Sequence, residues 1–76
     1  MNKKEYLLRK KEKRRSITIK RLEVEITRLA EVLYSLPEDN QEEKDRILNQ
    51  IRNHKARVEK ANRERQEIIQ KIVNIP

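Results

Sequence analysis

Cationic side chains near the N-terminus are the residues of this chain best suited to binding a ligand. The first 21 residues contain ten Lys and Arg residues and only two acids, Glu5 and Glu12. Two acids cannot neutralise ten cations, and an uncompensated cluster attracts polyanions by releasing their counterions. We expect contact with a nucleic-acid backbone, without reading of base sequence. The predicted contact residues are Arg9, Lys10, Lys11, Lys13, Arg14, Arg15, Lys20 and Arg21, supported by Arg63 and Arg65.

The same cations have a second interpretation as a solvated or protein-facing surface. Lys and Arg on the outer face of a helix keep a protein in solution and pair with acids one turn away. The chain has only two aromatic residues, Tyr6 and Tyr34, so the sequence lacks the stacking residues typical of single-strand binders. Backbone contact and a solvated or protein-facing basic surface both remain open.

The chain offers little for catalysis, metal binding or cofactor binding. It has no cysteine and one histidine, His54, which on an apolar seam is typical of a polar spacer. Acids such as Glu42 and Glu43 lie on a polar face, where no concavity is expected to shift their pKa. No phosphate-binding loop or metal motif occurs. We expect a non-enzymatic protein with no metal, no cofactor and no small-molecule ligand.

The composition predicts that long helices position these cations. The 76-residue chain has 43% charged residues, no glycine and two prolines, Pro37 and Pro76. Sheet hairpins need positive φ angles in their turns, which glycine supplies most readily. No apolar run approaches the roughly 18 residues of a membrane span, and residues 1–16 lack the apolar stretch of a signal peptide. We expect an all-α, cytoplasmic protein.

An apolar heptad pattern predicts the first helix. Its spacing alternates between three and four residues, as in a coiled-coil seam. Pro37 ends the pattern because proline disfavours the helical conformation in the residue before it. The leucines behind the basic segment are similar in layout to a basic leucine zipper, but they end after three heptads, and the segment lacks the Asn and small residues that read bases. The seam consists of Ile19, Leu22, Ile26, Leu29, Leu33 and Leu36.

A second heptad pattern after the turn matches the first in reverse order. Folding one seam onto the other pairs residues whose numbers add up to 80, such as Leu29 with Ile51. A constant sum is the register of an antiparallel hairpin. The sequence therefore predicts an antiparallel two-helix hairpin, a helical coiled coil folded back on itself. The second seam consists of Ile47, Ile51, His54, Val58, Ala61, Arg65, Ile68, Ile72 and Ile75.

The predicted seam weakens at the end far from the turn. Arg15 falls opposite Arg65, next to Glu12, so the helices either separate there or turn the arginines outwards. The first 15 residues are therefore a continuous helix, a hinged helix or a mobile arm. The expected divisions are a basic extension at 1–15, a first helix at 16–36, a turn at 37–40 and a second helix at 41–75.

Opposite charges are expected at opposite ends of the hairpin. The central segment 22–52 holds eight acids against four cations, and the C-terminal segment 53–76 holds six cations against three acids. An antiparallel arrangement brings both basic segments to the open end. The acids that collect at the turn are Glu38, Asp39, Glu42, Glu43 and Asp45.

Apolar residues beside the seam indicate a further partner. A lone hairpin of this size is marginally stable, and extra apolar positions are typical of a helix with more than one neighbour. The simplest arrangement is a homodimeric four-helix bundle. The alternative is a partner helix docked on these residues, which would make the chain an adaptor or inhibitor. The predicted interface residues are Ile17, Val24, Val32, Leu48, Ile69 and Val73.

Overall fold

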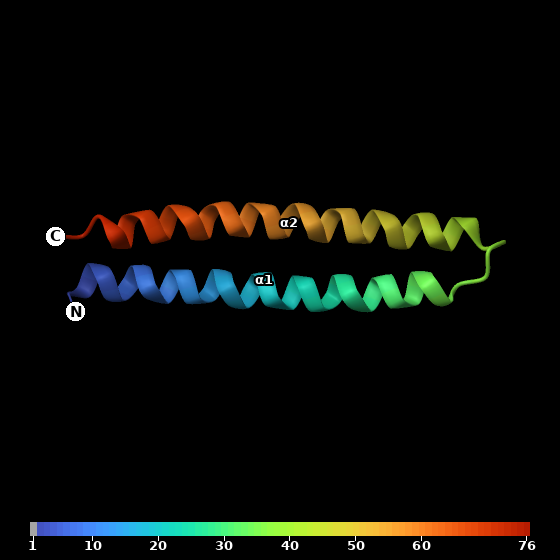
Figure 1. The fold of residues 1–76 in the computed structure, drawn as a ribbon, viewed down its shortest axis with the longest axis horizontal. Coiled ribbons are helices and arrows are strands. Elements are labelled where there is room, and N and C mark those ends of the chain that lie inside the picture. The colour runs from blue at the N-terminus through green and yellow to red at the C-terminus, as the bar shows by residue number, and fades with distance from the viewer. Residues whose placement is uncertain (1) are drawn as a thin grey trace.

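The computed structural model describes residues 2–76 as two long antiparallel helices packed against each other (Figure 1). Helix α1 spans Lys3–Ser35 and helix α2 spans Gln41–Val73, and each has 33 residues. Within the described residues no strand occurs. The molecule is a rod of 59 × 14 × 12 Å, with both chain ends at one end and the turn at the other. The predicted all-α helical hairpin is confirmed.

Helix α1 begins and ends where its sequence requires. The Oδ1 atom of Asn2 accepts a hydrogen bond of 2.7 Å from the Glu5 amide, which caps the first turn. At the other end Leu36 is extended, with ψ of 144°, because the ring of Pro37 excludes the helical conformation there. The Leu36 amide donates to the Leu33 carbonyl at 3.3 Å. The helix therefore ends at residue 35, one residue before the predicted end.

The basic N-terminal segment is part of α1. The helix continues from Lys3 to Ser35 without a break, so residues 3–15 take the continuous arrangement among the three considered. Residue 1 lies outside the described residues. Leu8 is buried and lies beside Lys71 and Ile75 of the C-terminal segment. Packing against the second half of the chain therefore holds this segment in place.

The connection between the helices is a short turn. The Asn40 amide donates to the Pro37 carbonyl at 3.1 Å, and the Lys44 amide donates to the Asn40 carbonyl at 3.1 Å. Glu42 and Glu43 lie in the first turn of α2, where the helix dipole favours negative charge. Helix α2 ends at residue 73, two residues before the predicted end.

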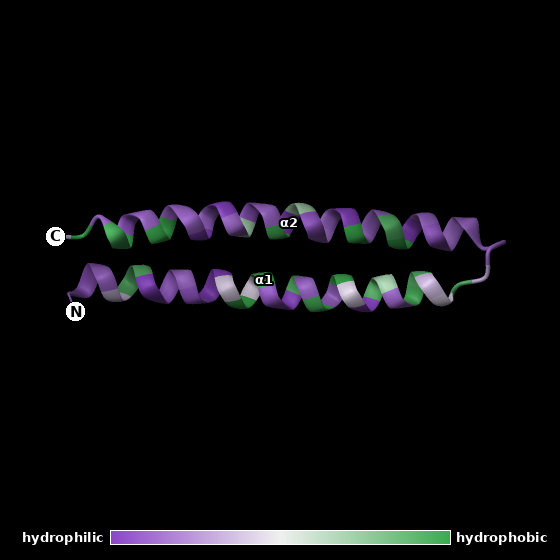
Figure 2. Cartoon of the chain, in the orientation of Figure 1, coloured by the Kyte–Doolittle hydropathy of each residue, from purple (hydrophilic) through white to green (hydrophobic). Residues whose placement is uncertain are grey.

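The core is one seam between the helices, on the predicted heptad positions. Figure 2 shows the hydrophobic residues of α2 along the side that faces α1. Near the turn, Leu29, Ile47 and Ile51 form a cluster against which Ile26, Leu33 and Leu36 pack. The buried residues are Leu8, Ile19, Leu22, Leu29, Ile47, Ile51, Ala61 and Ile68.

Both helices of residues 2–76 are longer than the roughly 18 residues of a membrane span, but both are rich in charged side chains. Neither combines the length and the apolar character needed to cross a bilayer.

Candidate functional site

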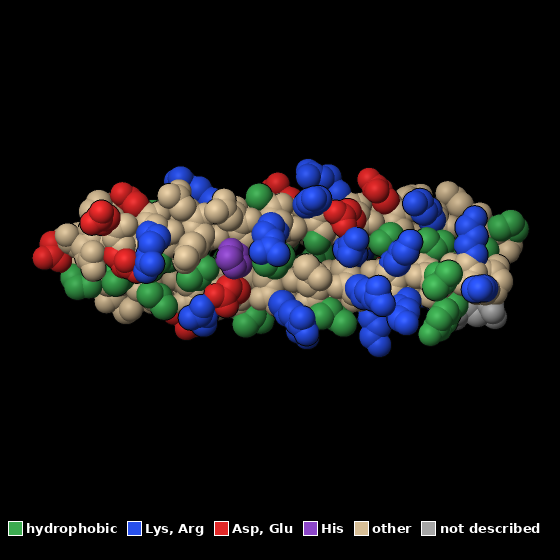
Figure 3. Space-filling model, turned by 180° about the vertical axis from the view of Figure 1, so that it is seen from behind, with side chains coloured by type: hydrophobic (Ala, Val, Ile, Leu, Met, Phe, Trp, Pro, Cys, Tyr) green, Lys and Arg blue, Asp and Glu red, His purple; other side chains and the backbone are tan. Residues whose placement is uncertain are grey.

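The folded hairpin separates its charges along the rod. Because the helices are antiparallel, the basic first segment and the basic last segment lie at the same end, opposite the turn (Figure 1). Figure 3 shows most Lys and Arg side chains of this face toward that end, and several Asp and Glu side chains at the turn, with further acids in the middle and among the cations. We name residues 3–21 together with residues 57–71 the basic end. The acidic tip consists of Glu38, Asp39, Glu42, Glu43 and Asp45.

Two ion pairs join the helices within the basic end. Arg65 Nε donates to Glu12 Oε1 at 2.7 Å. Arg15 Nε lies 2.6 Å from Glu64 Oε2. Each arginine therefore meets a carboxylate of the other helix, and the expected clash between the two arginines does not arise. We name these four residues the ion-pair layer.

Apolar contacts continue on both sides of the ion-pair layer. Ile19 and Ala61 are buried on its turn side, and Leu8 and Ile68 are buried on its outer side. The Nε atom of Arg15 is buried and has no hydrogen-bond partner within residues 2–76, so its contact with the Glu64 carboxylate is ionic without the geometry of a hydrogen bond. The helices stay together beyond this layer, so of the two alternatives considered for this position, separation of the helices does not occur.

Glu12 is the most strongly perturbed acid of the ion-pair layer. The hydrogen bond from Arg65 holds the pKa of Glu12 below its usual value, and the Ser16 hydroxyl, 3.0 Å away, lowers it further. Partial burial of the carboxyl raises the pKa but does not cancel these bonds. The side chains of Glu12 and Arg65 are 26% and 37% exposed, so solvent screens the pair. We assign it at most about 1 kcal/mol.

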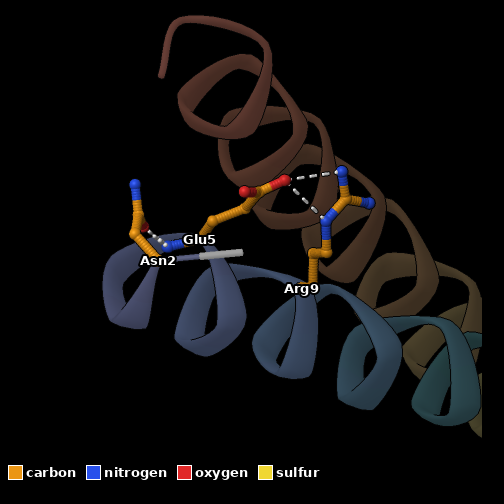
Figure 4. A network of polar contacts seen from close by, with 3 residues as sticks. All are labelled: Asn2, Glu5 and Arg9. Carbon is orange, nitrogen blue, oxygen red and sulfur yellow. Dashed lines mark hydrogen bonds and ion pairs between the residues drawn. The ribbon is translucent and has the colours of Figure 1, made fainter. Parts of the chain in front are cut away.

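Arg9 is also matched by an acid. Figure 4 shows its guanidinium bound to the Glu5 carboxylate, with Nε and Nη2 donating to Oε1 at 3.1 and 2.9 Å. Glu5 is the residue whose amide bonds to the Asn2 cap, so this pair lies on the first turns of α1. Three predicted phosphate contacts, Arg9, Arg15 and Arg65, are therefore occupied by carboxylates.

The other predicted phosphate contacts carry unmatched charge. All are exposed, and none forms an ion pair with an acid of residues 2–76. Towards the turn, Arg28 pairs with Glu25 and Arg46 pairs with Glu43. This leaves three cations of that half without an ion pair within residues 2–76, namely Lys44, Arg52 and Lys55. Free positive charge is therefore concentrated at the basic end. The seven residues are Lys10, Lys11, Lys13, Arg14, Lys20, Arg21 and Arg63.

Three depressions follow one another between the helices at the basic end. Their volumes are about 660, 450 and 290 Å³. The first and second share Lys11 and Lys71, and the second and third share Arg15 and Glu64, so together they form one groove. We name it the cationic groove. Its charged lining consists of Lys4, Lys11, Arg14, Arg15, Arg57, Lys60 and Lys71, with Glu64 and Glu67.

The predicted site and the cationic groove overlap in part. Lys11, Arg14 and Arg15 belong to both, whereas Lys10 and Lys13 line a separate depression on α1. The predicted contacts omitted four lysines and arginines of the groove. Their helical positions beside the seam, on the same side in both helices, were the signal that could have found them. These residues are Lys4, Arg57, Lys60 and Lys71.

The six predicted interface residues do not lie in one row. Ile17 and Val24 are 44% and 63% exposed and lie on the outer surface of α1, around a depression that Lys20 and Arg21 complete. By heptad position Ile17 and Val24 lie on the side of α1 opposite the seam. The predicted interface residues of α2, Leu48, Ile69 and Val73, each directly follow a seam residue in the sequence. Val32 and Val73 are exposed, and Leu48 and Ile69 are half-buried.

His54, the histidine of the seam, was predicted to be a polar spacer. It is half-buried, and its Nδ1 lies 2.8 Å from the Gln50 carbonyl oxygen. That distance fits donation by a protonated Nδ1 to the preceding helical turn. Among residues 2–76, no three His, Cys, Asp or Glu side chains are arranged to hold a metal ion.

Comparison of the chain with protein-family models, with curated proteins and with solved structures finds no match.

Proposed function

We propose that this chain is a small non-enzymatic binding element that holds a nucleic acid by its phosphate backbone, as an accessory or regulatory factor. The observation that carries this proposal is the unmatched positive charge at one end of the rod. Twelve exposed Lys and Arg residues there lack an acid partner within residues 2–76, and seven of them are the unmatched contacts predicted from the sequence. When Lys and Arg side chains neutralise phosphates, the cations condensed on the nucleic acid are released into solution. This release of counterions favours binding.

The acidic tip gives the interaction a direction. The rod is 59 Å long, several times the screening length of about 8 Å at physiological salt. A polyanion near the basic end is therefore attracted by the local cations and is barely affected by the distant acids. A polyanion near the turn meets the acids first. The hairpin should consequently approach a nucleic acid with its open end.

The proposal is tested by titrating a fluorescent 20-base-pair DNA duplex with the protein at several salt concentrations and measuring anisotropy. Backbone binding predicts a linear fall of log K with log salt, with a slope of about −0.9 per phosphate contact. Four contacts correspond to a loss of about 100-fold between 50 and 200 mM salt. Absence of binding at 50 mM salt would contradict the proposal.

A matched pair of variants controls for overall charge. Lys11→Gln with Arg14→Gln removes one lysine and one arginine from the basic end. Arg52→Gln with Lys55→Gln removes the same two types from exposed positions closer to the turn. We expect the first pair to lower the affinity about tenfold or more and the second pair to change it less than about threefold. Equal losses would show that net charge alone governs binding.

We propose a protein-interaction adaptor as the second candidate function. Its supporting observation is the exposure of Ile17 and Val24 between Lys20 and Arg21, an apolar patch with a cationic border. A partner helix with an apolar stripe and acidic edges would complement this patch. Light scattering checks whether the patch is free: this candidate predicts a monomer of 9.3 kDa. A tight homodimer that the Val24→Lys variant disrupts would contradict it.

A further inference from the structure

The positive charge at the basic end is unequal around the rod. On the side of the cationic groove, cations come from both helices, including Lys11 of α1 and Lys60 and Lys71 of α2. Around the depression that contains Lys10 and Lys13, every lining residue comes from α1. A ligand in the groove is therefore flanked by positive charge on two sides, and a ligand on the outer surface of α1 meets it on one.

We propose that the cationic groove holds one phosphate backbone of a DNA double helix, aligned with the hairpin; this inference rests on the proposed function. The α1 lining extends from Lys4 to Leu22, about 27 Å at 1.5 Å per helical residue. Phosphates of one B-DNA strand recur about every 3.4 Å along the axis. Several phosphates therefore have room to lie beside the cations of the groove.

The acids of the groove leave a clear excess of positive charge. Glu64 is neutralised by Arg15, whose Nε lies 2.6 Å from the Glu64 carboxylate. Glu67 has no cation partner within residues 2–76 and is exposed. It is therefore the acid of the groove that opposes a bound phosphate, and its removal should strengthen binding.

The groove lining favours a DNA duplex over single strands and over RNA. None of the described residues that line the three depressions is aromatic, so bases of a single strand find no stacking surface there. Sequence-specific RNA recognition relies on unstacked bases, and double-stranded RNA is recognised by 2′-hydroxyl contacts in addition to phosphates, whereas the backbone of B-DNA offers phosphates without 2′-hydroxyl groups. The two inner depressions present mainly charged side chains, which match the phosphates of a duplex whose bases remain paired, while Leu7, Leu8, Ile75 and Pro76 line the outermost one.

The test compares two double variants that remove the same charge from different sides of the rod. Lys11→Gln with Lys60→Gln changes the groove, and Lys10→Gln with Lys13→Gln changes the outer surface of α1. All four lysines are exposed, and circular dichroism verifies that the helices are retained. The probe is a 20-base-pair DNA duplex, with the same sequence as single-stranded DNA and as duplex RNA in parallel titrations.

The groove variant should bind the DNA duplex about 10- to 100-fold more weakly at 0.1 M salt, with the salt slope reduced by about 1.8. The outer-surface variant should lose less than about threefold, because the proposed phosphate contacts are confined to the groove, which removes Lys10 and Lys13 from the contacts predicted from the sequence. Glu67→Gln should bind about two- to fivefold more tightly, because a negative charge beside the backbone is gone.

Failure of the groove proposal and failure of nucleic-acid binding itself give different results. If both double variants lose affinity equally, the groove is not the binding surface, although backbone binding stands. Tighter binding of single-stranded DNA or duplex RNA overturns the choice of DNA duplex. If the unmodified protein binds none of the three probes, the proposed function itself fails.

Discussion

At the scale of single residues, the ion-pair layer shows how the hairpin tolerates charge on its seam. Glu12 and Arg65 occupy seam positions, and each has a partner across the interface. Moving one helix along the other by a heptad would place these charges opposite apolar residues. A charge left unpaired at an interface costs more than the pair contributes, so the layer favours one register.

Replacing Glu12 by glutamine should reduce the dependence of stability on acid pH. The pKa of Glu12 is lowered in the folded state, so its contribution is present above the unfolded-state pKa and disappears as the pH falls through the folded-state pKa. The unmodified protein should therefore lose up to about 1 kcal/mol through this group as the pH falls below the ordinary carboxyl pKa of 4.5 and through the lower folded-state pKa. Urea unfolding followed by circular dichroism measures the effect.

The control for this prediction is Glu23→Gln. Glu23 is exposed on the same helix and forms no ion pair within residues 2–76. Its variant should show the same acid sensitivity as the unmodified protein. If Glu12→Gln behaves like Glu23→Gln at every pH, the bond between Glu12 and Arg65 does not contribute to stability in solution.

The sequence predicted the positions of Glu12, Arg15 and Arg65 on the seam, but it did not predict that Glu64 is the partner of Arg15. Heptad positions alone placed Arg15 opposite Arg65, and they predicted that the helices separate there or that the arginines turn outwards. Glu64 lies beside the seam rather than on it, so a comparison of seam positions does not include it. The direction of a long arginine side chain depends on such neighbours, and these become known only when the two helices are placed together.

At the scale of elements, the apolar cluster of the seam lies in the half of the hairpin next to the turn. The cluster around Leu29, Ile47 and Ile51 lies near the turn and consists of apolar side chains. At the open end, Leu8 and Ile68 lie beyond a layer of charges. Most of the hydrophobic stabilisation should therefore come from the turn half.

Truncation of Ile47 should be the more damaging of two equivalent changes. Ile47 is 3% exposed within the cluster, so Ile47→Ala removes fully buried methyl groups and should cost about 2–4 kcal/mol. The half-buried Ile72 lies at the open end, and Ile72→Ala should cost about 1 kcal/mol. Urea unfolding compares them directly. Similar losses in both variants would show that the seam is equally stable along its length.

The elements themselves were largely predictable. Alternating spacings of three and four have one simple structural reading, and Pro37 fixes where the first helix must stop. The helix ends shifted by one or two residues because terminal conformations depend on local bonds such as that of the Leu36 amide. Continuity of α1 through residue 15 depended on burial of Leu8, which needs the second helix in place.

At the scale of the whole molecule, the sequence predicted which end is basic but not which side. Positive charge at the open end follows from the antiparallel order alone. The cationic groove depends in addition on which flanking positions of α1 meet those of α2. The prediction therefore omitted Lys60 and Lys71, and it included Lys10 and Lys13, which lie around another depression.

The same register explains why the proposed partner surfaces compete little with each other. The patch of Ile17 and Val24 lies on the outer surface of α1, and the lining of its depression shares no residue with the cationic groove. A nucleic-acid backbone and a protein helix would therefore use different sides of the rod. Substitutions in the cationic groove consequently leave the patch intact, whereas Lys20 and Arg21 border the patch and also belong to the unmatched cations of the basic end.

Both chain ends lie together at the open end of the rod, and this position decides how the molecule responds to mechanical load (Figure 1). A force that pulls the two ends apart acts across the helices rather than along them. It therefore opens the hairpin like a zipper, one layer at a time, beginning with Leu8 and Ile68 and then breaking the ion pairs. The apolar layers near the turn are the last to separate. A hairpin tethered through its ends would thus yield first where its positive charge is concentrated.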